Sequence, residues 1–245
     1  MSREEFCRAI QSLRPYTDYL YFHLMGEPLL HPLLSDFLAL AGELGFRVIL
    51  TTNGTLLPER EALLLDSECL HKINISLQSF EANEGGDLQG YAAHCAAIAQ
   101  RAGERGKLCV LRLWNGNGQD RLNDEIRQIL SEFFPEPWPQ SRGSMLLAPG
   151  VFLEPGEKFD WPDREAELQP VRFCQGLRDQ IGVLADGTVV PCCLDHEGDL
   201  ALGNLFSQSM EEILSSERAE RLYRGFSHGK AEEELCRRCG YAARF

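Results

Sequence analysis

Short apolar runs alternate with longer amphipathic segments through the first half of the chain. Apolar runs of four to eight residues between turn residues are typical of buried strands, and apolar residues spaced three and four apart are typical of helices. Because each predicted strand is followed by a helix, the order indicates a parallel sheet with right-handed crossovers. The predicted strands are residues 18–24, 46–52, 72–79 and 107–114, and the predicted helices are residues 2–13, 33–45, 58–66, 87–106 and 120–134.

Turn and capping residues support several of these boundaries. Ser2 is followed three positions later by Glu5, the pattern of a capping box at a helix start. Gly45 is placed to end the helix predicted at 33–45, and Asn53–Gly54 turns the chain after the second strand.

The last third of the chain has a different pattern. Prolines break the alternation between residues 133 and 143, residues 144–154 predict one more strand, and residues 153–170 predict a loop or linker. Asp186–Gly187 lies inside residues 181–190, and this turn signal predicts a hairpin of two short strands before a helix at 207–226. The predicted domains are an α/β domain at 1–150, a linker at 151–173 and a small cysteine-rich domain at 174–245.

Composition and charge restrict the kinds of binding partner and the cellular compartment that we expect. The 245 residues carry 24 basic and 37 acidic side chains, so the net charge is 24 − 37 = −13, which argues against nonspecific nucleic-acid binding. No apolar run approaches the roughly 20 residues of a membrane helix, and the charged N-terminus has no apolar core of a signal peptide. We therefore expect a cytoplasmic protein with no nucleic-acid or membrane partner, in which thiols stay reduced.

The nine cysteines form two groups. Cys7, Cys69, Cys95 and Cys109 are scattered through apolar or helical stretches, where a small buried hydrophobic role is the simplest interpretation. The other five gather in the last third: Cys174, Cys192, Cys193, Cys236 and Cys239. Clustered cysteines in a reducing compartment indicate metal or redox chemistry more often than disulfides.

Four of these cysteines have the spacing C-x17-C-x43-C-x2-C. A C-x2-C pair lets two thiolates of one short loop bind one metal centre, and Cys192 closes the predicted hairpin. Four thiolates suit Zn²⁺ or an iron–sulfur cluster, and the spacing alone does not choose between them. Cys193 points to the opposite face of a regular strand, so we expect it not to be a ligand, although the two neighbours are able to exchange roles.

Cys174, Gly187 and Cys192 form a C-x12-G-x4-C pattern that is followed by a C-x2-C pair. This pattern resembles the SPASM/Twitch extension of radical S-adenosylmethionine (SAM) enzymes, which holds auxiliary [4Fe-4S] clusters. The resemblance is to the shorter Twitch form with one cluster, because further cysteines do not follow the C-x2-C pair. It implies four ligands: Cys174, Cys192, Cys236 and Cys239.

The segment 21–32 contains Gly26-Glu27-Pro28 and resembles the second-strand motif of the same family. The resemblance implies a partial (β/α)6 barrel, with these residues at the amino group of S-adenosylmethionine. Independently of it, a carboxylate after a parallel strand faces the edge where such sheets bind ligands. Similar positions after the following strands imply contacts with the cofactor's ribose or carboxylate by Thr52, Asn53, Ser76, Gln78 and Arg112.

A C-x3-C-x2-C loop, which radical SAM enzymes use to bind the cluster that cleaves the cofactor, does not occur in the sequence. The family pattern implies an N-terminally truncated barrel whose parent uses a reductant protein and acts on a peptide or small molecule. We expect the chain as given to be inactive in that chemistry. Two alternatives remain open, a non-catalytic cluster-binding scaffold and a zinc-binding α/β protein.

Overall fold

The computed structural model describes residues 1–82, 86–118 and 120–245, and these divide into two compact units. One unit joins Met1–Thr17 to Phe159–Phe245, and the other is Asp18–Lys158. The units differ from the predicted boundaries at the N-terminus, because the first helix groups with the C-terminal part. The predicted domains at 1–150, 151–173 and 174–245 stay a prediction.

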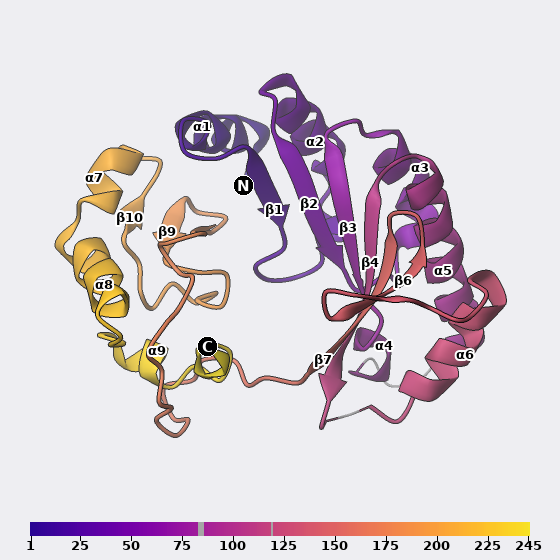
Figure 1. The fold of residues 1–245 in the computed structure, drawn as a ribbon. Coiled ribbons are helices and arrows are strands. Elements are labelled where there is room, and N and C mark those ends of the chain that lie inside the picture. Colours follow the sequence, from indigo (N-terminus) through magenta and orange to yellow (C-terminus); the bar gives the residue numbers. More distant parts are fainter. Residues whose placement is uncertain (83–85, 119) are drawn as a thin grey trace. The chain divides into compact units, whose positions relative to one another are not determined.

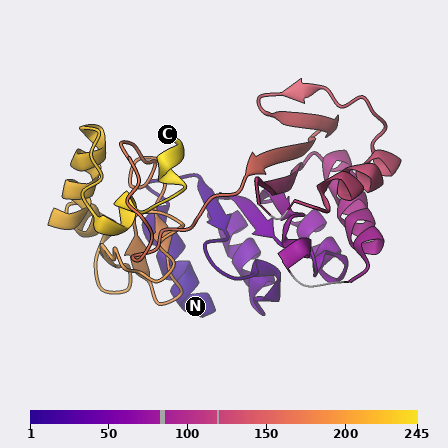
Figure 2. The same cartoon turned by 90° about the horizontal axis from the view of Figure 1, so that it is seen from below.

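The unit Asp18–Lys158 is built on a seven-stranded sheet with the order β1-β2-β3-β4-β7-β6-β5 (Figure 1). Strands β1, β2, β3, β4 and β7 pair in parallel, and β6 and β5 continue antiparallel at one end (Figure 2). The strands are β1 (Tyr19–Phe22), β2 (Arg47–Thr52), β3 (Leu70–Ser76), β4 (Leu108–Gly116), β5 (Gln140–Ser141), β6 (Ser144–Ala148) and β7 (Val151–Glu157).

Helices connect these strands and pack on one face of the sheet (Figure 1). They are η1 (Pro28–Leu30), α2 (Leu34–Glu43), α3 (Leu57–Asp66), α4 (Ser79–Ala82), α5 (Leu88–Glu104) and α6 (Asn123–Phe133). Alternate strand residues such as Leu50, Ile75 and Leu111 face this layer and are completely buried. Burying a side chain of this size contributes about 1.5–3 kcal/mol, so this layer is the main core of the unit.

The opposite face of the same sheet is polar. Ser76 of β3 pairs with Arg112 of β4, which pairs with Glu154 of β7, so these side chains share a face. Lys72 and Asn74 lie four and two positions before Ser76 in β3, and alternation puts them on that face as well. The sheet therefore separates an apolar, helix-covered side from a side with ionisable groups.

The other unit holds a small antiparallel sheet in the order β10-β9-β8 and several short helices. Its elements are α1 (Arg3–Leu13), β8 (Gly182–Val183), β9 (Thr188–Val190), β10 (Gly203–Asn204), α7 (Met210–Leu214), α8 (Glu217–Ser227), α9 (Glu234–Arg237) and η2 (Ala242–Arg244). The Ser2–Glu5 capping box forms as predicted at the start of α1. Within this unit the Arg8 guanidinium lies 5.0 Å from the Phe206 ring centre.

The mixed α/β architecture with a parallel sheet confirms the predicted fold class, although the strands form an open sheet rather than a closed barrel. Two predicted elements are wrong in detail. Residues 144–154 hold two strands, because Gly150 adopts a positive φ of 78° and reverses the chain between β6 and β7. Residues 207–226 hold two helices, because Ser216 caps a new helix start at α8.

No helix among the described residues is long and apolar enough to span a membrane.

Candidate functional sites

The four predicted ligand thiols come from three segments of the unit that contains β8–β10. Cys174 lies in the irregular segment before β8, and Cys192 follows β9 by two residues. Cys236 is within α9, and Cys239 comes just after it. The C-x2-C pair therefore has one thiol on a helical turn and one beyond its end, a local arrangement that keeps both near one point.

Burial and repulsion between the thiols raise their pKa values. Burial raises the pKa of Cys236, and repulsion from the Cys192, Cys174 and Cys239 thiolates raises it further. Burial raises the pKa of Cys192 to about 12, with Cys174 and Cys193 adding to the shift. Such thiols stay protonated alone, so ionising them together requires a positive centre among them, which a metal provides.

Backbone amides point at the sulfur atoms. Gly176 N–H donates to Cys174 Sγ at 3.3 Å, and Ala242 N–H donates to Cys239 Sγ at 3.4 Å. Gly176 also permits a close approach, because a Cβ there would lie 3.0 Å from the Pro191 oxygen and 3.5 Å from Cys174 Sγ. Amide donors stabilise thiolates, and hydrogen bonds to sulfur tune iron–sulfur potentials, so the donor set fits such a cluster.

The structure changes the expectation for Cys193. Strand β9 ends at Val190, and both Cys192 and Cys193 lie in the irregular chain that follows. Strand alternation therefore does not separate the two thiols. Burial raises the pKa of Cys193, and Cys174 and Cys239 raise it further, so this fifth thiol is also close to the group.

The thiols do not lie in the close arrangement of an assembled metal site. Within residues 1–82, 86–118 and 120–245, no three His, Cys, Asp or Glu side chains are gathered closely enough to hold one metal ion. Tetrahedral zinc draws four sulfurs to about 2.3 Å from one point. A four-iron cluster binds each thiolate through a different iron, so it accepts a wider arrangement.

In the sheet unit, Glu27 joins two of the predicted cofactor segments. Its Oε1 accepts a hydrogen bond from Leu29 N–H at 3.0 Å, and its Oε2 accepts one from Asn53 N–H at 2.7 Å. Gly26 before it has a φ of +82°, which a glycine adopts without strain. Pro28 begins η1 directly after this carboxylate. The Gly-Glu-Pro motif thus fixes the loop after β1 to the end of β2.

Side chains from α4 and α5 also stabilise the turn after β2 by hydrogen bonds. The Tyr91 hydroxyl donates to the backbone oxygen of Asn53 at 2.7 Å, and Ser79 Oγ donates to the same oxygen at 3.2 Å. Asn53 Oδ1 accepts from Thr55 N–H at 3.0 Å, so this side chain is used within the turn. Thr52 is only 2% exposed, and its hydroxyl accepts from Gly54 N–H at 3.0 Å. Thr52 therefore lies toward the helix-covered face rather than the polar one.

Ser76 is the last residue of β3 and Gln78 lies two residues beyond it, whereas Arg112 lies in the middle of β4 rather than near its end as predicted, because β4 continues to Gly116. Ser76 and Arg112 are directly paired across the two strands. The Arg112 guanidinium lies 4.3 Å from the Trp114 ring centre, and the buried Gln78 Oε1 has no hydrogen-bond partner among the described residues. The structure thus places Ser76 beside Arg112, and the contacts of all three residues with a cofactor stay a prediction.

Sequence reasoning missed three polar positions on the same face: Lys72, Asn74 and Glu154. The alternation of Lys72, Asn74 and Ser76 with apolar residues in β3 is the signal that marks this polar face. Glu154 falls where the predicted strand at 144–154 overlaps the predicted loop at 153–170, so the sequence assigned it to no face, whereas β7 extends to Glu157.

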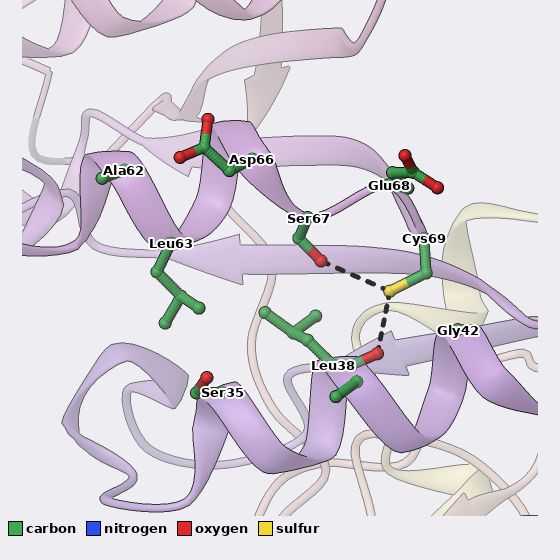
Figure 3. A pocket seen from close by; sticks show the side chains of 10 residues that line it. Ser35, Leu38, Gly42, Ala62, Leu63, Asp66, Ser67, Glu68 and Cys69 are labelled. Carbon is green, nitrogen blue, oxygen red and sulfur yellow. Dashed lines mark hydrogen bonds between the residues drawn. The ribbon is translucent and has the colours of Figure 1, made fainter.

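A separate hollow of about 440 Å³ lies between α2 and α3 (Figure 3). Leu38, Ala39 and Leu63 contribute apolar walls, and Asp66 and Glu68 lie at its margin. Cys69 Sγ in this hollow donates to the Leu38 oxygen at 3.1 Å. None of the predicted site residues lines it, and the Cys69 thiol has a structural hydrogen bond. Of the four scattered cysteines that were predicted to be buried, Cys95 and Cys109 are completely buried, whereas Cys7 and Cys69 are only partly buried.

Comparisons with known proteins agree with these observations. Residues 174–240 match the SPASM family, described as an iron–sulfur cluster-binding domain. A crystal structure of BtrN in complex with AdoMet and 2-DOIA is similar, with a TM-score of 0.59, 16% identity and coverage of 98% of this chain and 80% of that one. No curated protein sequence matched the chain.

Two further structures share the fold. A histidine-tagged form of anSMEcpe with bound AdoMet has a TM-score of 0.59, 14% identity and coverage of 100% of this chain and 78% of that one. Streptococcus suis SuiB has a TM-score of 0.61 and 13% identity, and the match covers 98% of this chain and 64% of that one. At these identities the likeness shows the fold alone, and the family match covers residues 174–240.

Proposed function

We propose that this chain, with a SPASM match at residues 174–240 and the fold of radical SAM enzymes, is a Twitch-type protein that binds one auxiliary [4Fe-4S] cluster. Cys174, Cys192, Cys236 and Cys239 are the proposed ligands. The observation that carries the proposal is that all four cysteines, from three separate segments, lie inside the match to an iron–sulfur cluster-binding domain.

The protein's own residues prepare this site. Amides of Gly176 and Ala242 donate to the sulfurs of Cys174 and Cys239, which favours the thiolate form that a cluster needs. The bound cluster would supply a site for electron transfer or for binding a substrate group. The match of residues 174–240 to a domain described as iron–sulfur cluster-binding supports a cluster over a single zinc ion.

The second part of the proposal assigns the polar edge of the sheet to S-adenosylmethionine. Support comes from Glu27 and Asn53, which lie in the loops after β1 and β2, and from Ser76 at the end of β3, because parallel sheets bind ligands at the carboxyl ends of their strands. Arg112 of β4 lies beside Ser76. The BtrN and anSMEcpe structures that share this fold contain AdoMet. We infer that Gly26, Glu27 and Pro28 shape the loop at the cofactor's amino group, with Thr52 acting only through the turn that it stabilises. Gln78 contributes an Oε1 acceptor that has no hydrogen-bond partner within the described part of the chain.

The third part concerns activity. The 245 residues contain no C-x3-C-x2-C loop, so we propose that this chain alone binds its auxiliary cluster but does not cleave S-adenosylmethionine. A reductant protein and a C-x3-C-x2-C loop would be needed for radical chemistry on a peptide or small-molecule substrate. Reductive cleavage of S-adenosylmethionine by this chain alone would contradict this part without affecting the cluster assignment.

Anaerobic reconstitution with iron and sulfide tests the cluster. We expect about four irons and about four sulfides per chain, the stoichiometry of one [4Fe-4S] centre. Cys236→Ser removes a proposed ligand and is expected to reduce bound iron and change the visible and electron paramagnetic resonance spectra. Cys69→Ser is the matched control, because Cys69 lies in the hollow between α2 and α3. One zinc without sulfide, or equal cluster content in Cys236→Ser and wild type, would remove the proposal.

A further inference from the structure

The brace, residues 159–169, is an irregular segment that leads to Cys174, the first proposed cluster ligand. It belongs to the same compact unit as the four proposed ligands. Its residues, all of them described, contain no helix or strand, so the segment depends on contacts with other parts of the unit to keep its position. Those contacts reach both of the other segments that carry proposed ligands.

The brace is hydrogen-bonded to the C-x2-C segment. Gln169 N–H donates to the backbone oxygen of Arg237 at 2.6 Å, and the Arg238 guanidinium donates to the backbone oxygen of Ala166. The two arginines are the residues inside the C-x2-C pair. The bonds therefore join the brace to the short stretch of chain that positions two of the proposed ligand thiols.

A glycine directly after this pair lets the two backbones pack closely. A Cβ on Gly240 would lie 2.8 Å from the oxygen and 3.1 Å from the nitrogen of Asp160 in the brace. The rings of the neighbouring residues Phe159 and Tyr241 also meet, with their centres 5.0 Å apart. Because glycine has no Cβ, it permits this approach, and any other residue at position 240 would push the brace away from the C-x2-C segment.

The brace also contacts the loop that follows Cys192. The Trp161 ring meets the His196 ring edge-on with their centres 5.4 Å apart, and Arg164 forms an ion pair with Asp199. These two contacts come from the middle of the brace, between its two sets of contacts with the C-x2-C segment. The brace therefore connects two ligand-bearing segments that are distant in the sequence.

The loop after Cys192 is itself closed, so its contacts with the brace restrain the ligand. The Asp195 carboxylate is 2% exposed and accepts from Asp199 N–H at 3.0 Å and Leu200 N–H at 2.9 Å. Asp195 N–H donates to the backbone oxygen of Cys192 at 3.4 Å. Holding Asp199 in place therefore also limits the movement of Cys192.

We propose that the brace is a positioning element that holds the three ligand-bearing segments together and slows the release of iron from the proposed cluster. This inference rests on the proposed function, because it requires the cluster at these thiols. A ligand segment has to move away before its thiolate can release iron, and irregular segments open locally more easily than packed helices or strands. The brace opposes that opening, because movement of either contacted segment breaks its contacts.

Anaerobic transfer of iron to excess EDTA tests the proposal, with the loss of visible absorbance followed in the reconstituted chain without denaturant. Gly240→Ala should speed iron release at least about fivefold, because the added Cβ overlaps the Asp160 backbone and weakens the contact. Gly225→Ala is the matched control for a destabilised unit. Its Cβ would lie 2.5 Å from Glu232 Cγ and 2.8 Å from the Lys230 oxygen, so it creates a comparable clash outside the brace. Its release rate should stay close to that of wild type.

A second pair of variants tests the brace without a backbone clash. Arg164→Gln should speed release about two- to fivefold, the range of one exposed ion pair. Arg164→Asp combined with Asp199→Arg exchanges the two charges and should bring the rate back toward that of wild type. Arg224→Gln is the control, because it removes an exposed ion pair with Glu220 within α8 and should leave the rate unchanged.

Release rates in Gly240→Ala and Arg164→Gln that equal those of their controls would overturn the proposal, because iron loss would then not depend on the brace. Iron and sulfide are measured in every sample before EDTA is added. A full cluster in wild type with unchanged release in the brace variants removes this inference alone. A wild-type chain that takes up no cluster removes the proposed function and this inference with it.

Discussion

Gly187, the glycine of the C-x12-G-x4-C pattern, gives the sharpest stability prediction. It lies in the β8–β9 turn with a φ of +85°, and its carbonyl accepts from Leu205 N–H at 2.9 Å. A Cβ at this position would come within 2.6, 2.8 and 2.9 Å of three carbons of the Phe206 ring. Real Cβ atoms do not approach that closely, so Gly187→Ala must both strain the backbone and move the ring.

The two effects can be added. A non-glycine residue with left-handed backbone costs about 1–2 kcal/mol. Overpacking costs about 1–3 kcal/mol, so Gly187→Ala should destabilise the cluster-bearing unit by about 2–5 kcal/mol. Gly229 has a φ of +72° and nothing within 4 Å of the added Cβ, so Gly229→Ala should show only the backbone part. The difference between the two variants, about 1–3 kcal/mol, measures the contact with Phe206.

Urea unfolding of the reconstituted protein, followed by the visible absorbance of the cluster, reports on this unit alone. The midpoint for Gly187→Ala should fall well below that for Gly229→Ala, at an unchanged slope. Equal midpoints would refute the reasoning, because they would mean that Phe206 does not limit the side chain at position 187. A smaller loss in Gly187→Ala combined with Phe206→Leu would attribute the remaining cost to the backbone.

Three further predictions concern the sheet unit. Tyr91→Phe removes the hydrogen bond to the Asn53 oxygen and should lower stability by about 1 kcal/mol in urea unfolding, and an unchanged midpoint would contradict this. Lys107→Met removes bonds from Nζ to the oxygens of Ser67 and Leu70 and should cost about 1–3 kcal/mol in the same assay, whereas a stabilised variant would contradict it. Burial and then Arg112 lower the pKa of His23 from 6.5, so the unfolded state takes up the proton first and stability is lost as pH falls below 6.5. Tryptophan fluorescence in urea should show this loss, and His23→Gln should reduce it.

The elements were predictable because their signals are local. Apolar runs marked β2, β3 and β4, and the Ser2–Glu5 pair marked the start of α1. The capping Ser216 inside a continuous amphipathic pattern was overlooked, and so one helix was predicted where α7 and α8 lie. The grouping of α1 with the C-terminal unit depends on contacts between distant parts of the chain, such as Arg8 with Phe206, which no local pattern contains.

The candidate sites also contain features that a local pattern predicts and features that depend on distant residues. The spacing of Cys236 and Cys239 predicts a shared centre because both thiols belong to one short segment. The bond from Asn53 N–H to Glu27 links residues 26 positions apart, so its role in joining two loops required the structure. Strand alternation assigned Cys193 to the far side, but the strand ends at Val190, and a boundary shift of a few residues changes that conclusion.

The Mössbauer spectrum of the chain reconstituted with ⁵⁷Fe tests the central claim most directly. The account predicts that nearly all bound iron, about four atoms per chain, has the spectrum of one [4Fe-4S] centre, and that Cys174→Ser changes it. A spectrum of isolated iron sites, or a chain that retains only zinc, would contradict the claim that these thiols share one cluster.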